Sequence, residues 1–191
     1  MLPLLYSVYP GLGIHKYFLG TKIQVQRVGD MTHHVGQTWK AEPDSNSLQG
    51  PIKTLTANSN VDADLWVYMA KDPAFYGVIG LAWVGTLCRT WWPGYQASIN
   101  EKRGSVLNTA QLVTHEMGHN LGMYHDFDSI HDGKGCNGQG FMSYGAVPTQ
   151  WSTCSKEDFL GQYNSLGKMS LAVPKVQCLL CRKRPGQATY V

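Results

Sequence analysis

The feature that most constrains this chain is the sequence HEMGH at residues 115–119, which lies in a stretch with helical periodicity. Residues four positions apart in a helix lie on the same face, one turn from each other. The imidazoles of His115 and His119 can therefore reach the same metal ion. Glu116 lies beside them, in a position to take a proton from a water molecule on that metal. The pattern thus predicts a metal site carried by a helix.

A third histidine, His125, follows His119 after five intervening residues. A continuous helix would turn this position away from the metal, so the helix must end before it. Gly122 allows this ending, because glycine has no Cβ and readily adopts a positive φ that redirects the chain. Three neutral imidazoles with one open position are typical of catalytic zinc sites. The sequence therefore predicts one catalytic Zn²⁺ held by His115, His119 and His125, with Glu116 as general base.

The composition fits one globular domain. With 191 residues, of which 43% are hydrophobic and 15% charged, the chain is long enough to bury its own core. The net charge is only +3 and the basic residues form no long stripe, so a nucleic-acid partner is not expected. No apolar run approaches the roughly 18–20 residues of a membrane span. We expect a soluble monomer with a domain over residues 1–181 and a basic tail or linker at 182–191.

The chain contains five cysteines, at positions 88, 136, 154, 178 and 181. The CxxC pair at 178–181 has no second pair, so it does not indicate a zinc ribbon. We favour two long-range disulfides and one remaining thiol, which implies an oxidising compartment. The alternative is five buried free thiols in a cytosolic protein.

The apolar pattern and the turn residues predict the main elements along the chain. The predicted strands are residues 22–28, a buried strand at 64–69 and a glycine-punctuated edge strand within 77–85. The predicted helices are one around 47–55, one from Asn108 or Thr109 to Leu121, and one from 156 to 163 or further. Residues 89–105 are predicted to be a loop, and a turn-rich stretch is expected up to about residue 153.

Other polar residues receive simpler interpretations. Asp126, Asp128 and Asp132 precede Gly133 but do not have EF-hand spacing, so we expect a solvated turn. The remaining histidines lack ligand spacing and are expected at the surface or in local hydrogen bonds: His15, His33, His34 and His131.

The extended motif HEMGHNLGMYHD at residues 115–126 resembles the zinc motif HExxHxxGxxH of the metzincin endopeptidases. The Asp after the third histidine is similar to the adamalysin/reprolysin branch, which includes snake-venom metalloproteinases and ADAM-type sheddases. Residues 140–145 resemble the family's Met-turn, with Met142 beneath the zinc site. Residues 151–155 are similar to the segment that opens its C-terminal helix, and residues 79–88 to its substrate-binding edge strand.

This resemblance implies an α/β fold of the metzincin type. Its parts would be a mixed, mostly parallel twisted sheet with an antiparallel edge strand, an active-site helix, and a small C-terminal subdomain with the Met-turn and a C-terminal helix. The family's N-terminal strand and helix have no counterpart here, and we expect them to be missing, together with the propeptide and the disintegrin module. The resemblance also implies the disulfides Cys88–Cys178 and Cys136–Cys154, with Cys181 unpaired or bonded outside this chain.

By the same resemblance, an extended substrate would add as a strand alongside Ile79, Gly80, Leu81 and Ala82. Asp126 would orient ligands through hydrogen bonds to backbone or ring groups near the site. The family's calcium site is matched only in part, by Asp62 or Asp64, so Ca²⁺ is an open alternative.

The implied function is hydrolysis of peptide bonds in protein or peptide substrates by a secreted or extracellular enzyme. Its signal sequence and propeptide would not be part of this chain. The alternative is a truncated, catalytically impaired protease-like domain that acts as a binding or decoy module. A thermolysin-type site is disfavoured, because it needs a glutamate as third ligand and only Glu157 follows the motif.

Overall fold

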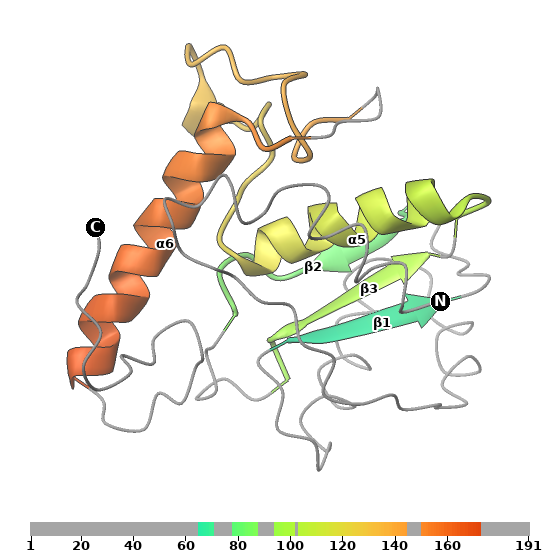
Figure 1. The fold of residues 1–191 in the computed structure, drawn as a ribbon. Helices are drawn as coiled ribbons and strands as arrows, with labels where there is room; N and C mark the ends of the chain where they lie inside the picture. Colours follow the sequence, from blue (N-terminus) through green and yellow to red (C-terminus); the bar gives the residue numbers. More distant parts are fainter. Residues whose placement is uncertain (1–64, 71–77, 88–93, 102, 145–149, 173–191) are drawn as a thin grey trace.

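The computed structural model describes residues 65–70, 78–87, 94–101, 103–144 and 150–172 (Figure 1). The predicted strand at 22–28, the predicted helix at 47–55 and the predicted Cys88–Cys178 disulfide lie outside these residues. The described elements, in chain order, are β1 (Trp66–Ala70), β2 (Gly80–Ala82), β3 (Ala97–Glu101), α5 (Val106–Asn120), the 3₁₀ helix η1 (Ser129–His131) and α6 (Thr153–Ala172). In Figure 1, α5 runs across the sheet, and α6 stands at a steep angle to it at one end.

The three described strands form a mixed sheet in the order β1-β3-β2. β1 pairs with β3 in parallel, with Tyr68 opposite Ile99. β2 pairs with β3 in the antiparallel direction, with Leu81 opposite Ile99. The antiparallel strand therefore lies at one edge of the described sheet, as the sequence predicted.

The central strand β3 corrects the prediction of a loop over residues 89–105. Its sequence, ASINE, has one large apolar residue, Ile99, and two buried polar residues, Ser98 and Asn100. The Asn100 amide donates to the Tyr68 carbonyl at 3.3 Å and to the Ser98 hydroxyl at 3.2 Å. This segment is a strand because neighbours on both sides complete its hydrogen bonds, and strand preference depends strongly on such context.

The core under α5 is built on β3. Ala97 and Ile99 are fully buried, and partly buried side chains of the neighbouring segments pack against them: Trp66, Tyr68, Val78, Leu81 and Trp83. The strand β1, predicted to be buried, is half-buried along most of its described length. At the end of α5, the buried Asn120 amide lies 3.1 Å from each of three acceptors, on Trp83, Thr86 and Ala97. This contact joins the helix to the sheet near the metal site.

The helix α5 begins at Val106, two residues before the earlier of its two predicted starts, Asn108. Ser105 is the N-cap, and its hydroxyl accepts a hydrogen bond from the Asn108 backbone N–H at 3.1 Å. The predicted C-terminus is close to the observed one, with Asn120 as the last helical residue and Leu121 as the C-cap. The sequence therefore identified the helix and its end, and missed only its first turn.

The helix α6 also begins earlier than predicted. The Ser152 hydroxyl accepts from the Ser155 backbone N–H at 2.9 Å, which caps the first turn. A disulfide joins Cys154 in this turn to Cys136 in the preceding segment. Among the described residues, none of the helices has the length and apolar character needed to cross a membrane.

Candidate metal centre

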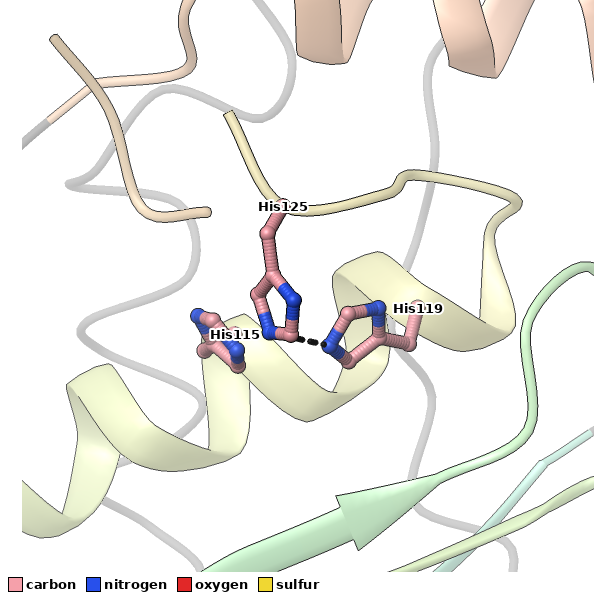
Figure 2. Close-up of side chains that lie close together, drawn as sticks. All are labelled: His115, His119 and His125. Carbon is pink, nitrogen blue, oxygen red and sulfur yellow. Dashed lines mark hydrogen bonds between the residues drawn. The ribbon is translucent and has the colours of Figure 1, made fainter. Parts of the chain in front are cut away.

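Three histidines converge above the C-terminal half of α5 (Figure 2). His115 and His119 project from the helix, and His125 reaches them from the segment that follows it. One ligand atom from each ring lies within 4.8 Å of the others. The structure thus brings together the three residues that the sequence predicted as ligands.

The hydrogen bonds of two rings orient their nitrogens toward a common centre. His115 Nδ1 lies 2.6 Å from the Phe141 carbonyl oxygen, and His119 Nδ1 lies 2.8 Å from the Met123 carbonyl oxygen. Because a carbonyl oxygen only accepts, each Nδ1 carries the hydrogen, and Nε2 of the neutral ring keeps its lone pair. His119 Nε2 lies 3.2 Å from His125 Nε2. Imidazoles held in this way by second partners are suited to bind a divalent metal.

The burial of these rings keeps them neutral. Burial lowers the pKa of His119 to about 3, with the neighbouring histidines adding to the effect. Burial also lowers the pKa of His115 and of His125 below the ordinary value of an imidazole. At neutral pH the rings are therefore neutral, and each has one ring nitrogen without a proton that can bind a metal, so the donor set fits Zn²⁺.

The helix ends at Gly122 in the manner predicted. Gly122 has a φ of +99°. Its N–H donates to the His119 carbonyl at 2.8 Å, and the Met123 N–H donates to the Gly118 carbonyl at 3.0 Å. This pair of bonds is the Schellman motif, which ends a helix with a left-handed residue. The turn redirects the chain toward the site, where His125 lies.

Glu116 is buried beside the histidines. Only 4% of the residue is exposed, and burial raises its pKa to about 8. Its side chain packs against Gly80 of the edge strand β2: a Cβ at residue 80 would lie 2.7 Å from the Glu116 carboxyl carbon. The absence of a side chain at Gly80 therefore makes room for the Glu116 carboxyl group.

Met142 is fully buried and packs against the ligand helix. A Cβ at Gly118, between the two helical histidines, would lie 2.6 Å from the Met142 sulfur. The neighbouring Phe141 supplies the carbonyl that orients His115. This segment therefore supports α5 both through packing and through a hydrogen bond to a histidine.

Asp126 differs from what was expected of it. It is 2% exposed, so the predicted solvated turn is wrong at this residue. Its carboxylate accepts from the hydroxyls of Ser143, Ser152 and Ser155, not from backbone or ring groups. Its own N–H donates to the Met142 carbonyl at 3.0 Å. Asp126 thus joins the segment after His125 to residues 142–143 and to the start of α6.

Three further residues near the site were not identified from the sequence. The Tyr144 hydroxyl lies 3.3 Å from His125 Nε2, and the Phe127 ring stacks on the His125 ring with centroids 4.8 Å apart. His131 was expected at the surface or in local hydrogen bonds; it is 4% exposed, which excludes the surface position, and it hydrogen-bonds the His125 carbonyl six residues before it. Tyr144 lies in the segment used to recognise the Met-turn, which was a usable signal. The sequence contains no such signal for His131, because its second partner, Asp158, is distant in sequence.

The described residues contain no other group of three or more His, Cys, Asp or Glu side chains arranged to hold a metal ion. The residues considered for calcium, Asp62 and Asp64, lie outside the described ranges.

Comparisons with known proteins agree with this geometry. The family model described as metallo-peptidase family M12 (Reprolysin_5) matches residues 17–158. The human disintegrin and metalloproteinase domain-containing protein 9 is 37% identical over 175 residues, which cover 88% of this chain and 20% of that protein. The mouse protein "A disintegrin and metalloproteinase with thrombospondin motifs 10" is 30% identical over 182 residues, which cover 83% of this chain and 16% of that protein.

The chain thus spans a fifth or less of the length of these curated relatives. The match to a solved structure described as a chaperone-substrate complex covers 54% of this chain and 15% of the chain in that structure, with 22% identity. Its TM-score of 0.28 is too low to inform the fold. The family match includes the three histidines, Glu116 and the start of α6. The chain therefore belongs to metallo-peptidase family M12, in its reprolysin group.

Proposed function

We propose that this chain is the catalytic domain of a zinc-dependent endopeptidase that hydrolyses peptide bonds in protein or peptide substrates. The observation that carries the proposal is the convergence of three neutral imidazoles beside a buried glutamate. His115, His119 and His125 would hold Zn²⁺ through ring nitrogens. When bound, the ion supplies a Lewis acid that activates water and polarises the scissile carbonyl. Membership of the M12 family supports this chemistry.

Glu116 is proposed as the general base. Its carboxylate would take a proton from the attacking water and pass it to the departing amine. The role needs the ionised form, which burial disfavours in the metal-free site. A divalent cation close by favours the ionised form again, because opposite charges lower the pKa of a carboxyl group.

The edge strand β2 is proposed to hold the substrate. An extended peptide that adds to a sheet edge gains main-chain hydrogen bonds, while pockets select its side chains. β2 lies at one edge of the described sheet, and its Gly80 contacts the Glu116 side chain. A peptide beside Ile79–Ala82 would therefore pass directly by the proposed general base.

A secreted or extracellular location is proposed as well. The Cys136–Cys154 disulfide supports it, because disulfides persist mainly in oxidising compartments. The names of both relatives describe metalloproteinases, which supports the activity but leaves substrates and partners as proposals.

Zinc binding is the first test of the proposed function. We expect the purified chain to bind about one Zn²⁺, because three converging imidazoles suit that ion. Metal analysis after reconstitution and dialysis measures the stoichiometry, and the His125→Ala variant serves as the control that lacks one ligand. Absence of stoichiometric zinc in the wild type would contradict the proposal. Casein cleavage that stops when a chelator is added would separate an active peptidase from a binding or decoy module.

A second test concerns the space that Gly80 leaves for Glu116. We expect Gly80→Ala to reduce proteolysis about tenfold or more, because the new methyl group would displace the Glu116 carboxyl group from its position. Zinc affinity should remain near that of the wild type, since no ligand is touched. The control is Gly104→Ala, where an added Cβ meets nothing within 4 Å. Equal peptide-cleavage rates for both variants would show that Glu116 does not need this space.

A further inference from the structure

The proposed third ligand, His125, needs support from outside the ligand helix. His115 and His119 are held relative to each other by the hydrogen bonds of α5. His125 lies beyond the turn at Gly122, in a segment without helix or strand. Its position must therefore depend on contacts that this segment makes with other parts of the fold.

A carboxylate of α6 provides the first of these contacts. Asp158 Oδ2 accepts a hydrogen bond from the Tyr124 backbone N–H at 2.9 Å. This bond attaches the residue that immediately precedes His125 to the second turn of α6, a helix that begins 29 residues after Tyr124.

The second contact passes through His131, at the end of the 3₁₀ helix η1. His131 Nδ1 lies 2.9 Å from the His125 carbonyl oxygen, and His131 Nε2 lies 3.1 Å from the Asp158 carboxylate. Both partners are acceptors, so both ring nitrogens are placed to donate. Asp158 therefore holds the backbone before His125 directly and the backbone after it through the His131 ring.

His131 and Asp158 are largely buried, so the loss of a hydrogen bond between them has a large energetic cost. The side chains of His131 and Asp158 are 1% and 11% exposed. Removing one of the two residues would leave one buried polar atom of the other without its partner, which costs more than the loss of an exposed bond. A neighbouring pair, Lys134 with Glu157, joins the same two segments at 2.8 Å but is exposed, with 45% and 61% of the side chains accessible. Exposed ion pairs of this kind contribute little to the stability of a fold.

We propose that His131 and Asp158 are positioning residues that fix the backbone around His125 to α6 and thereby set the geometry of the metal site. The inference rests on the proposed function, because it takes His125 as a ligand of Zn²⁺. Neither residue touches the metal or the substrate in this role. Partners that orient a ligand typically change metal affinity by about 10- to 100-fold when they are removed.

Substitutions of Asp158 separate geometry from charge. Asparagine keeps an oxygen for the Tyr124 N–H and offers an N–H to the Nε2 of a neutral His131, so the hydrogen bonds can persist. Leucine has a similar size and can form neither bond. The matched control is Glu157→Gln, which removes the charge of the adjacent residue on the same helix and breaks the exposed pair with Lys134.

The experiment uses the whole chain, first stripped of metal. Zn²⁺ affinity is measured by competition with a chromophoric chelator, and Co²⁺ is substituted to record the visible spectrum, which reports ligand geometry. We expect Asp158→Leu to lower Zn²⁺ affinity by roughly tenfold or more and to alter the Co²⁺ spectrum. Asp158→Asn should stay within a few-fold of the wild type, and Glu157→Gln should match it.

A second variant guards against loss of folding. His131→Phe retains a ring of comparable volume but removes both hydrogen bonds, and it should weaken Zn²⁺ binding as Asp158→Leu does. Thermal unfolding followed by circular dichroism shows which variants are folded. Wild-type affinity and an unchanged Co²⁺ spectrum in either folded variant would overturn the inference and leave the proposed function intact. A wild-type chain that binds no Zn²⁺, or a His125→Ala variant that binds it normally, would instead overturn the proposed function.

Discussion

Replacement of Glu116 by glutamine is expected to lower kcat/KM for peptide cleavage by a factor on the order of 10² or more, while Zn²⁺ affinity stays near that of the wild type. Glutamine has nearly the same shape and cannot accept the proton of the attacking water. The three histidines are unchanged, so the metal site should persist. The measurements are cleavage of a peptide library and Zn²⁺ titration of the same preparation.

The fold of this variant should be intact. Burial raises the pKa of Glu116, so the folded, metal-free protein already disfavours the charged form that glutamine cannot adopt. Thermal unfolding of the metal-free protein provides the control. Near-normal cleavage by a folded Glu116→Gln variant would remove Glu116 from the role of general base.

The Gly122→Val variant should lose Zn²⁺ affinity and proteolysis together, each by at least about tenfold, without any change in a ligand. Two penalties act at this residue. A φ of +99° is unfavourable for a β-branched side chain by about 1–2 kcal/mol or more. In addition, a Cβ here would lie 2.6 Å from Cβ of Gln162 on α6. The turn would have to change, and His125 would be displaced with it.

The control for this variant is Gly133→Val. Gly133 also has a positive φ, +78°, but an added Cβ there meets nothing within 4 Å. The Gly133→Val variant should therefore lose some stability through backbone strain and keep its Zn²⁺ affinity. Chelator competition and peptide cleavage on both variants make the comparison. If Gly122→Val kept wild-type affinity and activity, the turn at Gly122 would not be what places His125.

The metal site could be predicted because most of its geometry is local. Helix periodicity alone puts His115 and His119 on one face, and a single positive φ at Gly122 explains how His125 follows them. The pattern that reveals these features lies within eleven consecutive residues, 115–125. The exact position of His125 depends in addition on the contacts of its segment with His131 and Asp158. The family resemblance used the motif at residues 115–126 together with residues 79–88, 140–145 and 151–155, and the match to metallo-peptidase family M12 over residues 17–158 confirms it.

The strand β3 could not be predicted in the same way. Apart from Ile99 its residues have little strand preference of their own, and Ser98 and Asn100 would be expected at the surface. The pairing with β1 and β2 and the burial under α5 make it a strand. Such pairing joins residues that lie 16 to 31 positions apart, and the sequence pattern does not report it.

The ligand helix and its ending could thus be predicted from neighbouring residues, since they depend on hydrogen bonds within a few positions of the chain, and the family could be predicted from its motifs. Tertiary structure alone decided how the remaining parts support the site. It buried Asp126 among the hydroxyls of Ser143, Ser152 and Ser155, and it placed His131 between His125 and Asp158. The physical reason is that a buried polar side chain must find partners wherever the fold provides them. Here those partners come from α6 and residues near it, and no local spacing encodes that choice.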